Sequence, residues 1–247
     1  MNKTERCILE GYISVEASLI AKSREIQVVY IHKDKDPGTI DHLVKLAGSK
    51  KVKVKLVEKD FINKLATGKT HGGILAIAGE RKYLQLEELS LGNRSKEAFI
   101  VMLDGIEDPF NFGYAIRTFH AAGVDGLVLK PRNWMNASHF VAKASAGSSE
   151  LIPTARVETD EEAAQYFKKR GLKIACASRK NSISLFDMDL TVPLFIVVGG
   201  EKRGITRTFK KNADLKFMIP YGRNVNYSLP TVSAASIIAF EVLKQRL

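Results

Sequence analysis

Cysteine, tryptophan and long apolar segments are all scarce in this sequence. Among 247 residues there are two cysteines and one tryptophan. The longest apolar stretches, Leu194 to Val198 and Val232 to Phe240, fall well short of the roughly 18 residues that a membrane-spanning helix requires. The first seven residues, MNKTERC, place charge where a signal peptide has its apolar core. We therefore expect a cytoplasmic protein with no membrane association.

The sequence also lacks the common signatures of metal, nucleotide and nucleophile chemistry. Cys7 and Cys176 have no cysteine or histidine at metal-binding spacing, so both are predicted to be buried free thiols. The five histidines do not cluster, and the motifs G-x-G-x-x-G, H-E-x-x-H, G-x-S-x-G and C-x-x-C are absent. The segment GGEKRGIT, 199–206, resembles a phosphate-binding loop but has no lysine after its last glycine. We therefore expect no bound metal and no P-loop chemistry.

Basic residues are abundant and are spread along the whole chain. The formal charge is +11 and the pI is about 9.6. Residues 1–79 contain 14 Lys and Arg against 9 Asp and Glu, and residues 99–247 contain 20 against 14. A nucleic acid that both halves contact fits this distribution. Solvated surface lysines without a partner are the alternative that the charge count leaves open.

The first third of the chain alternates strand-like and helix-like segments, which predicts a small α/β domain. Its segment SKKVKVKLVEK alternates valine and lysine with the two-residue period of a half-buried strand. The outer lysines, Lys51, Lys53 and Lys55, are candidates for contacts with an RNA phosphate backbone. The alternative is an edge strand that lysines protect from aggregation. The predicted strands are 26–31, 52–57 and 74–78, and the predicted helices are 40–47 and 61–66.

Residues 80–97 interrupt this pattern with a charged, polar segment of no strong periodicity, which indicates a linker. A second alternation of strands and helices follows and predicts a mostly parallel sheet covered by helices. We therefore assign 1–79 and 98–247 to two α/β domains. Parallel sheets bind ligands beyond the carboxyl ends of their strands. The expected strands here are 98–103, 126–129, 172–177, 194–198 and 215–219, and the expected helices are 112–122, 160–170, 205–211 and one from Ser228 to the C-terminus.

The first of three unusually polar loops after predicted strands is DGIEDPFNFGYAIRTFHAAG. In it, Asn111 is expected to cap the next helix. Gly113 and Arg117 lie four residues apart, on one face of that helix. An arginine held there can clamp a phosphate or hold a hydroxyl for reaction. The alternative is a structural surface arginine.

The other two loops are rich in glycine and proline. In FIVVGGEKRGI, glycines surround Glu201, and the exposed backbone of such a turn can bind an adenine. In FMIPYGRNVNYSLPTV, Pro220 and Gly222 end a strand, and Ser228 is expected to cap the last helix. The N-terminus of that helix offers a site for an anionic or polar group. An ordinary glycine-rich turn is the alternative.

Taken in order, these three loops resemble the motifs of the SpoU family, also called the TrmH family, within the knotted SPOUT methyltransferases. Two further segments are similar to parts of the same family: KASAGSSELIP at 143–153, and THGGILAIA at 70–78 near the end of its substrate-binding domain. The family motif N-x-G-x-x-x-R appears as Asn111, Gly113 and Arg117, G-x-E-x-x-G as Gly199, Glu201 and Gly204, and Ile-Pro followed by Ser-Leu as Ile219, Pro220, Ser228 and Leu229.

This resemblance implies a fold, a cofactor and a reaction. The fold is α/β, with a carboxy-terminal trefoil-knot (SPOUT) domain preceded by a small α/β, ribosomal protein L30e-like, substrate-binding domain. The reaction is methyl transfer from S-adenosylmethionine to a ribose 2′-hydroxyl in structured RNA, with ribosomal RNA favoured and transfer RNA possible. A homodimer through the carboxy-terminal domain is also implied. The implied cofactor-binding residues are Gly199, Gly204, Ile219, Ser228 and Leu229.

The resemblance implies Arg117, Asn111 and Glu201 as catalytic residues. A guanidinium is normally protonated and a poor base. This favours orientation and charge stabilisation by Arg117, with Asn111 and Glu201 shaping the pocket. Proton abstraction by a transiently neutral Arg117 is the alternative, and the identity of the general base stays open.

One position departs from the family pattern, because Pro230 follows Ser-Leu where the family usually has asparagine. Proline is tolerated in the first turn of a helix, but it removes a side-chain amide and a backbone donor. This departure supports a second hypothesis, an RNA-binding assembly factor that has lost catalysis. Methylation of an RNA base is a third hypothesis, which the motifs favour less than ribose methylation.

Overall fold

The computed structural model describes residues 6–89, 97–131, 138–178, 180–200 and 204–247. Their contacts form two compact units. The N-terminal unit combines the described residues up to Lys82 with residues 138–151, and the C-terminal unit covers the described residues of 83–131 and 152–247. Each unit has its own hydrophobic core. Among the described residues, no helix combines the length and the apolar character needed to span a membrane.

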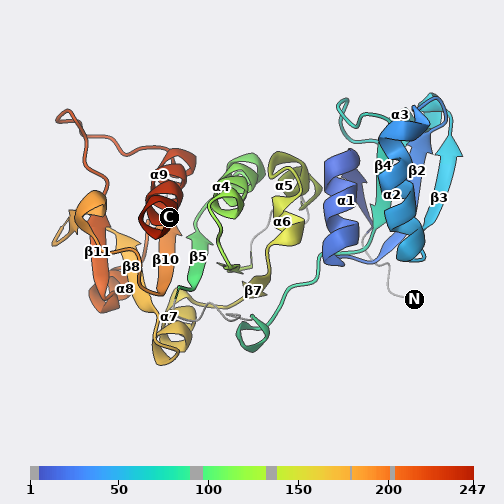
Figure 1. Cartoon of the computed structure of the whole chain (residues 1–247). Helices are drawn as coiled ribbons and strands as arrows, with labels where there is room; N and C mark the ends of the chain where they lie inside the picture. The colour runs from blue at the N-terminus through green and yellow to red at the C-terminus, as the bar shows by residue number, and fades with distance from the viewer. Residues whose placement is uncertain (1–5, 90–96, 132–137, 179, 201–203) are drawn as a thin grey trace. The chain divides into compact units, whose positions relative to one another are not determined.

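A four-stranded mixed sheet forms the centre of the N-terminal unit (Figure 1). The strand order is β1-β4-β2-β3, in which β4 is antiparallel to both of its neighbours and β2 is parallel to β3. The predicted strands and helices of this region are confirmed. The bounds are β1 (Cys7–Glu10), α1 (Tyr12–Ala21), β2 (Ile26–His32), α2 (Pro37–Ser49), β3 (Lys53–Val57), α3 (Lys59–Leu65) and β4 (Ile74–Ala78).

The lysine-rich strand β3 lies at the edge of this sheet. Lys53 and Lys55 are exposed, whereas Val54 is half-buried against the core. Lys51 precedes the strand, in a turn where its φ is 57°. The predicted alternation is therefore present, and the edge position is compatible with both of its interpretations, RNA contact and protection of the edge.

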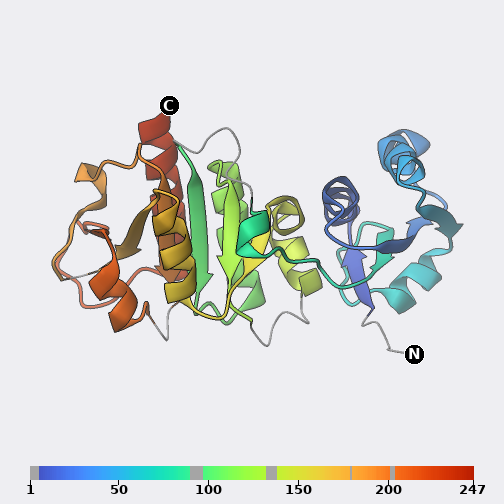
Figure 2. The ribbon, with the colours of Figure 1, turned by 90° about the horizontal axis from the view of Figure 1, so that it is seen from below.

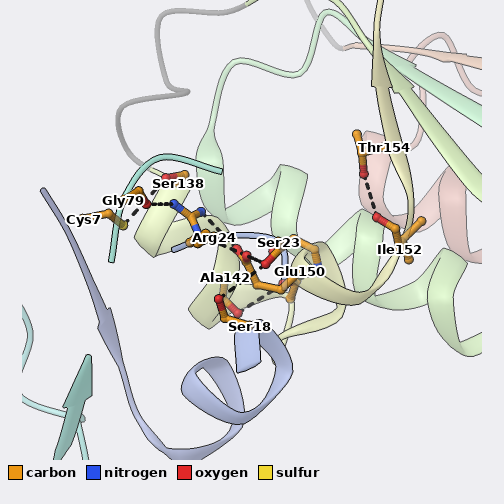
Figure 3. Close-up of polar contacts among 12 residues, drawn as sticks. Cys7, Ser18, Ser23, Arg24, Gly79, Ser138, Ala142, Glu150, Ile152 and Thr154 are labelled. Carbon is orange, nitrogen blue, oxygen red and sulfur yellow. Dashed lines mark hydrogen bonds and ion pairs between the residues drawn. The ribbon is translucent and has the colours of Figure 1, made fainter. Parts of the chain in front are cut away.

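Residues 138–151 form two short helices, α5 (Ser138–Ala144) and α6 (Ser148–Leu151), which pack on β1 and α1. A buried ion pair holds them in the N-terminal unit. Glu150 accepts hydrogen bonds from Arg24 Nε and Nη2, each 3.0 Å long, and from Ser23 Oγ at 2.5 Å (Figure 3). Burial by itself raises the pKa of the Glu150 carboxyl, but the Arg24 guanidinium outweighs it and the pKa is lowered. The domain limits 1–79, 80–97 and 98–247 stay a prediction.

A seven-stranded sheet forms the centre of the C-terminal unit, and its described strand pairs are all parallel. The strand order is β7-β6-β5-β10-β8-β11-β9. The strands are β5 (Phe99–Asp104), β6 (Gly126–Leu129), β7 (Thr154–Arg156), β8 (Lys173–Ala177), β9 (Ile183–Ser184), β10 (Leu194–Gly199) and β11 (Leu215–Met218). The predicted mostly parallel sheet is confirmed.

Helices cover both faces of this sheet (Figures 1 and 2). Helices α4 and α9 lie side by side on one face, and α7 and α8 lie on the other. Strand β5 is therefore buried along its whole length, as a doubly covered parallel strand must be. The helices are α4 (Pro109–Ala121), α7 (Asp160–Lys169), α8 (Arg207–Asn212) and α9 (Thr231–Arg246), with short 3-10 turns η1 (Leu86–Glu88) and η4 (Leu185–Asp187).

One hydrophobic cluster of the C-terminal unit lies between the sheet and α7. Phe167 of α7 packs on Phe195 of β10, with ring centroids 4.7 Å apart. On the opposite face, α9 contacts both α4 and β10. The last helix of the chain therefore packs on the central strand of the sheet, and the hydrogen bond from Thr231 to Gly199 places its N-terminus at the carboxyl end of β10.

Candidate functional site

Three strands of the C-terminal unit end at one edge of its sheet. β5 ends at Asp104, β10 at Gly199 and β11 at Met218. Gly199 is paired with Asp104 in the register of β10 and β5, and β8 links β10 to β11 in the same direction. The three polar loops predicted from the sequence follow these strand ends. The structure therefore brings them to one edge, where parallel sheets bind ligands.

The first two loops approach each other closely through backbone atoms at Gly105 and Gly200. A Cβ atom added to Gly200 would lie 1.9 Å from the carbonyl oxygen of Gly105, and a Cβ atom added to Gly199 would lie 2.9 Å from the nitrogen of Ile205. A side chain at Gly200 is therefore incompatible with this packing. Gly200 was not among the predicted site residues, although the doubled glycine at the end of a buried strand signals such a close approach.

Helix α4 begins earlier than predicted, at Pro109, and Asp108 is its N-cap. The Asp108 Oδ1 atom accepts a hydrogen bond from the N–H of Asn111 at 2.7 Å. The predicted capping role of Asn111 is therefore wrong, because proline favours the first helical position and moves the cap to the residue before it. Half-buried Asn111 instead lines a cavity of about 360 Å³ together with Thr231.

Helix α9 begins later than predicted, at Thr231, and the expected cap by Ser228 is wrong. Pro230 is the N-cap and makes no side-chain capping bond. Proline is suited to this place because an N-cap residue needs no backbone N–H for the helix. The Thr231 hydroxyl lies 3.4 Å from the carbonyl oxygen of Gly199 and donates to it. The N–H of Leu229 donates to the hydroxyl of Tyr221 at 3.0 Å, which closes the preceding loop.

A larger cavity of about 930 Å³ opens beside these loops. Ile219, Ser228 and Leu229, three of the predicted cofactor-binding residues, line it. The rest of its wall is strongly basic. Its cations are Lys180, Arg207, Lys210, Lys211, Lys216 and Arg223. They come from several segments of the chain and have no diagnostic spacing, so they could not be predicted from the sequence.

The dimensions and lining of this cavity fit S-adenosylmethionine. Its volume lies within the range of small-molecule sites. Ile219 and Leu229 supply apolar surface for an adenine, and the basic wall suits a carboxylate. The close backbone approach of Gly105 and Gly200 leaves no space for a side chain at Gly200. The residues present therefore fit the predicted cofactor.

The remaining predicted residues that the structure describes do not line the larger cavity. Arg117 is exposed on α4 and lines neither of these cavities. The carbonyl oxygen of Gly199 accepts a hydrogen bond from Thr231, which lines the smaller cavity. Gly204 is exposed, and Glu201 lies outside the described residues. Lys51, Lys53 and Lys55 belong to the N-terminal unit.

Both cysteines are free thiols, as predicted. Cys176 is buried, whereas Cys7 is only half-buried, because β1 lies at an edge of its sheet. Burial raises the pKa of both thiols. No cluster of three or more His, Cys, Asp or Glu side chains suited to a metal occurs in the described part of the chain.

Two family models match this sequence. The model of the SpoU rRNA Methylase family matches residues 98–240, and a model described as RNA 2′-O ribose methyltransferase substrate binding matches residues 8–84. A Staphylococcus saprophyticus protein placed in the TrmH family of tRNA/rRNA methyltransferases is 31% identical over 98% of this chain and 97% of its own length. A relative from Staphylococcus haemolyticus, placed in the same family, is 30% identical over 98% of this chain and 97% of its own length.

Solved structures of low sequence identity share the fold. An rRNA methyltransferase from Sinorhizobium meliloti superposes with a TM-score of 0.81 and 21% identity, over 99% of this chain and 89% of that one. The SpoU methyltransferase AviRb from Streptomyces viridochromogenes, solved with S-adenosylmethionine, gives 0.78 and 18%, over 98% and 90%. These likenesses confirm the predicted fold class, a SPOUT domain preceded by a small α/β domain. Given its two family matches and its assembled motif loops, the chain belongs to the SpoU family of RNA methyltransferases.

Proposed function

We propose that this chain transfers a methyl group from S-adenosylmethionine to a ribose 2′-hydroxyl of structured RNA. The observation that carries the proposal is the meeting of the three motif loops at one sheet edge, with Gly200 against Gly105 and Thr231 bonded to Gly199. The match of residues 8–84 to a substrate-binding model of RNA 2′-O ribose methyltransferases supports the ribose as the methylated group.

S-adenosylmethionine is the cofactor of this enzyme, and structural neighbours were solved with it bound. When bound, it supplies an electrophilic methyl group, so that the protein has to position the RNA and assist loss of a proton. Ile219, Ser228 and Leu229 line the cavity that would hold it. Gly199, Gly204 and Glu201 complete the proposed site on the neighbouring loop.

Arg117 is proposed to orient the RNA and to stabilise charge. It is exposed on α4 and has no hydrogen-bond or ion-pair partner among the described residues, so its guanidinium is available to a ligand that arrives from solvent. A protonated guanidinium donates hydrogen bonds and matches a phosphate with two parallel contacts. Half-buried Asn111, six residues earlier on the same helix, shapes the smaller cavity.

Ribosomal RNA is the proposed substrate, with transfer RNA as the alternative. The basic wall of the larger cavity and the excess of basic residues in both halves suit a large polyanion. A separate substrate-binding domain favours an RNA site that is recognised by its folded shape.

The test is to map 2′-O-methyl groups in ribosomal and transfer RNA from cells with and without this protein. A 2′-O-methyl group blocks alkaline cleavage at its nucleotide, so each lost mark appears as a new cleavage site. Loss of one mark in ribosomal RNA, and its restoration by purified protein with S-adenosylmethionine, is the expected result. A methylated base in place of a methylated ribose would contradict the proposal.

Pro230 does not distort the loop that carries it. Its φ of −52° fits the N-cap, and helix α9 starts directly after it.

Titration calorimetry with S-adenosylmethionine separates an active enzyme from an assembly factor that no longer binds the cofactor. Measurable binding supports the enzyme, and its complete absence favours the assembly factor.

A further inference from the structure

A second cavity lies in the N-terminal unit, outside the machinery described above. Its volume is about 450 Å³. It opens where β1 and β2 end and β4 begins, because β4 runs antiparallel to both of these strands. Its lining includes the first turn of α1, the loop after β2, the turn before β4, and Lys143 with Ala146 of the segment around α5 and α6.

Two almost fully buried polar side chains line this cavity, and each has one polar atom without a hydrogen-bond partner among the described residues. Ser14 is 4% exposed and His71 is 8% exposed, and both line the cavity. The Ser14 hydroxyl makes no hydrogen bond with any described residue. His71 Nδ1 accepts a hydrogen bond from the N–H of Gly73 at 3.1 Å, so a neutral ring carries its hydrogen on Nε2. Nε2 in turn has no partner among the described residues, which leaves two hydrogen-bond donors directed at one space.

The start of α1 adds further donors beside Ser14. Its N-cap is Gly11, which has a φ of 87° and no side chain to satisfy the first N–H groups of the helix. Tyr12 and Ile13, which carry those N–H groups, also line the cavity. The N-terminus of a helix of this length carries a partial positive charge and favours an anion.

Among the charged side chains that line the cavity, one cation has no anionic partner in the described part of the chain. Glu10 lines the cavity, but its carboxylate already accepts bonds from Thr67 and Gly68 and pairs with Lys143 at 2.9 Å. Lys35, also in the lining, forms no ion pair with the described residues. The cavity is therefore rich in donors and carries positive charge, and its ligand must present acceptors and negative charge.

We propose that this cavity binds one nucleotide of the RNA substrate, with a backbone phosphate held by Ser14, His71 and the N-terminus of α1. This inference rests on the proposed function, because it takes RNA as the substrate. The cavity volume suits a single nucleotide and excludes a double helix. Tyr12, half-buried at the wall, offers a ring for a base to stack on. The site lies at the end of the sheet opposite Lys51, because β3 begins beside Val28, near the start of β2.

The test measures the affinity of the full-length protein for deproteinised ribosomal RNA by filter binding, without cofactor. Ser14→Ala removes one donor. His71→Asn removes Nε2 while its side-chain oxygen still accepts from the N–H of Gly73. Each change is expected to raise the Kd roughly tenfold, the usual loss for a hydrogen bond to a charged group. The matched controls Ser49→Ala and His42→Asn, on exposed positions of α2, are expected to leave the Kd unchanged.

Nitrogen-15 spectra of the full chain identify what occupies the cavity. Uridine 5′-monophosphate is expected to shift the amides of Gly11 to Ser14 and the ring of His71, whereas uridine shifts them much less. If inorganic phosphate reproduces every shift and neither variant alters the RNA Kd, the cavity is a site for free anions and the proposal is overturned. An unchanged Kd for the Ser14→Ala, His71→Asn double variant overturns it equally.

Cofactor binding separates this inference from the proposed function. Calorimetry with S-adenosylmethionine is expected to give the same affinity for wild type and both variants, because the larger cavity belongs to the other unit. If RNA binding depends on Ser14 and His71 while no methyl transfer is found, the nucleotide site stands and the proposed function fails. If transfer proceeds and the variants bind RNA as wild type does, the opposite holds.

Discussion

At the scale of single residues, Arg117 gives the sharpest test of the proposed chemistry. It is exposed and lines neither cavity of the C-terminal unit, so its removal disturbs no packing. Arg117→Ala is expected to lower kcat for RNA methylation by roughly a thousandfold, as loss of a charge-stabilising donor does. Thermal unfolding and calorimetry with S-adenosylmethionine are expected to match wild type.

Two further variants control this prediction. Arg117→Lys keeps the charge without the planar fork and is expected to recover little activity. Lys169→Ala removes an exposed cation from α7 and is expected to keep full activity. Activity above a few per cent of wild type in Arg117→Ala would exclude the proposed role.

The ionised Glu10 carboxylate is expected to stabilise the fold at neutral pH, and this stabilisation is expected to be lost in acid. Burial by itself raises the pKa of its carboxyl, but hydrogen bonds from Thr67, Lys143 and Gly68 outweigh burial and lower the pKa to about 2. A lowered pKa stabilises the fold above the ordinary value of 4.5, and this contribution disappears as the pH falls toward 2. Glu10→Gln is expected to reduce the free energy of unfolding by about 2 kcal/mol at pH 7.

Urea denaturation of both proteins between pH 7 and pH 2 measures this effect. The difference between wild type and Glu10→Gln is expected to shrink below pH 4.5, because the carboxyl of the unfolded wild type then takes up a proton while that of the folded protein stays ionised until the pH approaches 2. A constant difference across this range would show that Glu10 acts through packing and not through its charge.

Local signals in the sequence indicated polar loops after three strands but not which residues cap the helices that follow. Asn111 and Ser228 are both good capping residues, yet Asp108 and Pro230 occupy the N-caps. Pro109 explains the first case, because proline favours the first helical position. The basic wall of the larger cavity had no sequence signal, since tertiary packing alone brings its residues together.

At the scale of elements, the loop after β10 depends on a glycine that has no space for a side chain. Gly200→Ala would place a methyl group 1.9 Å from the Gly105 carbonyl oxygen, so the loops are expected to separate. We expect a lower Tm and loss of S-adenosylmethionine binding by calorimetry. Gly222→Ala is the matched control, because its Cβ meets no atom within 4 Å. Equal cofactor affinity in the two variants would contradict the assembled-loop description.

The limits of strands could be predicted from the sequence where the strand was long enough to show a hydrophobic pattern. β6 and β4 match their predicted limits, β5 is shifted by one residue at both ends, and β10 extends one residue further than predicted. In contrast, β7 and β9 have three and two residues, too few for any pattern. Helices α5 and α6 are also short, and their place in the N-terminal unit depends on the ion pair between Arg24 and Glu150, which are far apart in the sequence.

At the scale of the whole molecule, the exposed apolar side chains of the C-terminal unit predict a homodimer. Phe110 and Tyr114 on α4 are 43% and 45% exposed, and Phe240 on α9 is 50% exposed. Because α4 and α9 lie side by side, we expect these rings to contribute to one dimer interface. Analytical sedimentation at micromolar concentration is expected to give a dimer, and Phe240→Glu a folded monomer. Leu56→Glu, at an exposed position of β3, is the control, and a wild-type monomer would refute the prediction.

The last prediction concerns which part of the molecule selects the RNA. The N-terminal unit is proposed to do so, and the full chain is needed to test it, because a fragment of residues 98–247 would leave Glu150 without Arg24. Phosphate contacts make RNA affinity fall steeply with salt. Reversing the charge of Lys51, Lys53 and Lys55 is expected to reduce the slope of log K against log salt by roughly two to three.

A matched reversal of Lys45, Lys59 and Lys64 changes the net charge equally at exposed positions of α2 and α3. It is expected to leave most of the slope intact, and cofactor affinity should be unchanged in both triple variants. The comparison decides between the two interpretations of the edge strand. Equal slopes in the two variants, together with aggregation of the β3 variant alone, would mean that its lysines protect a sheet edge and do not contact RNA.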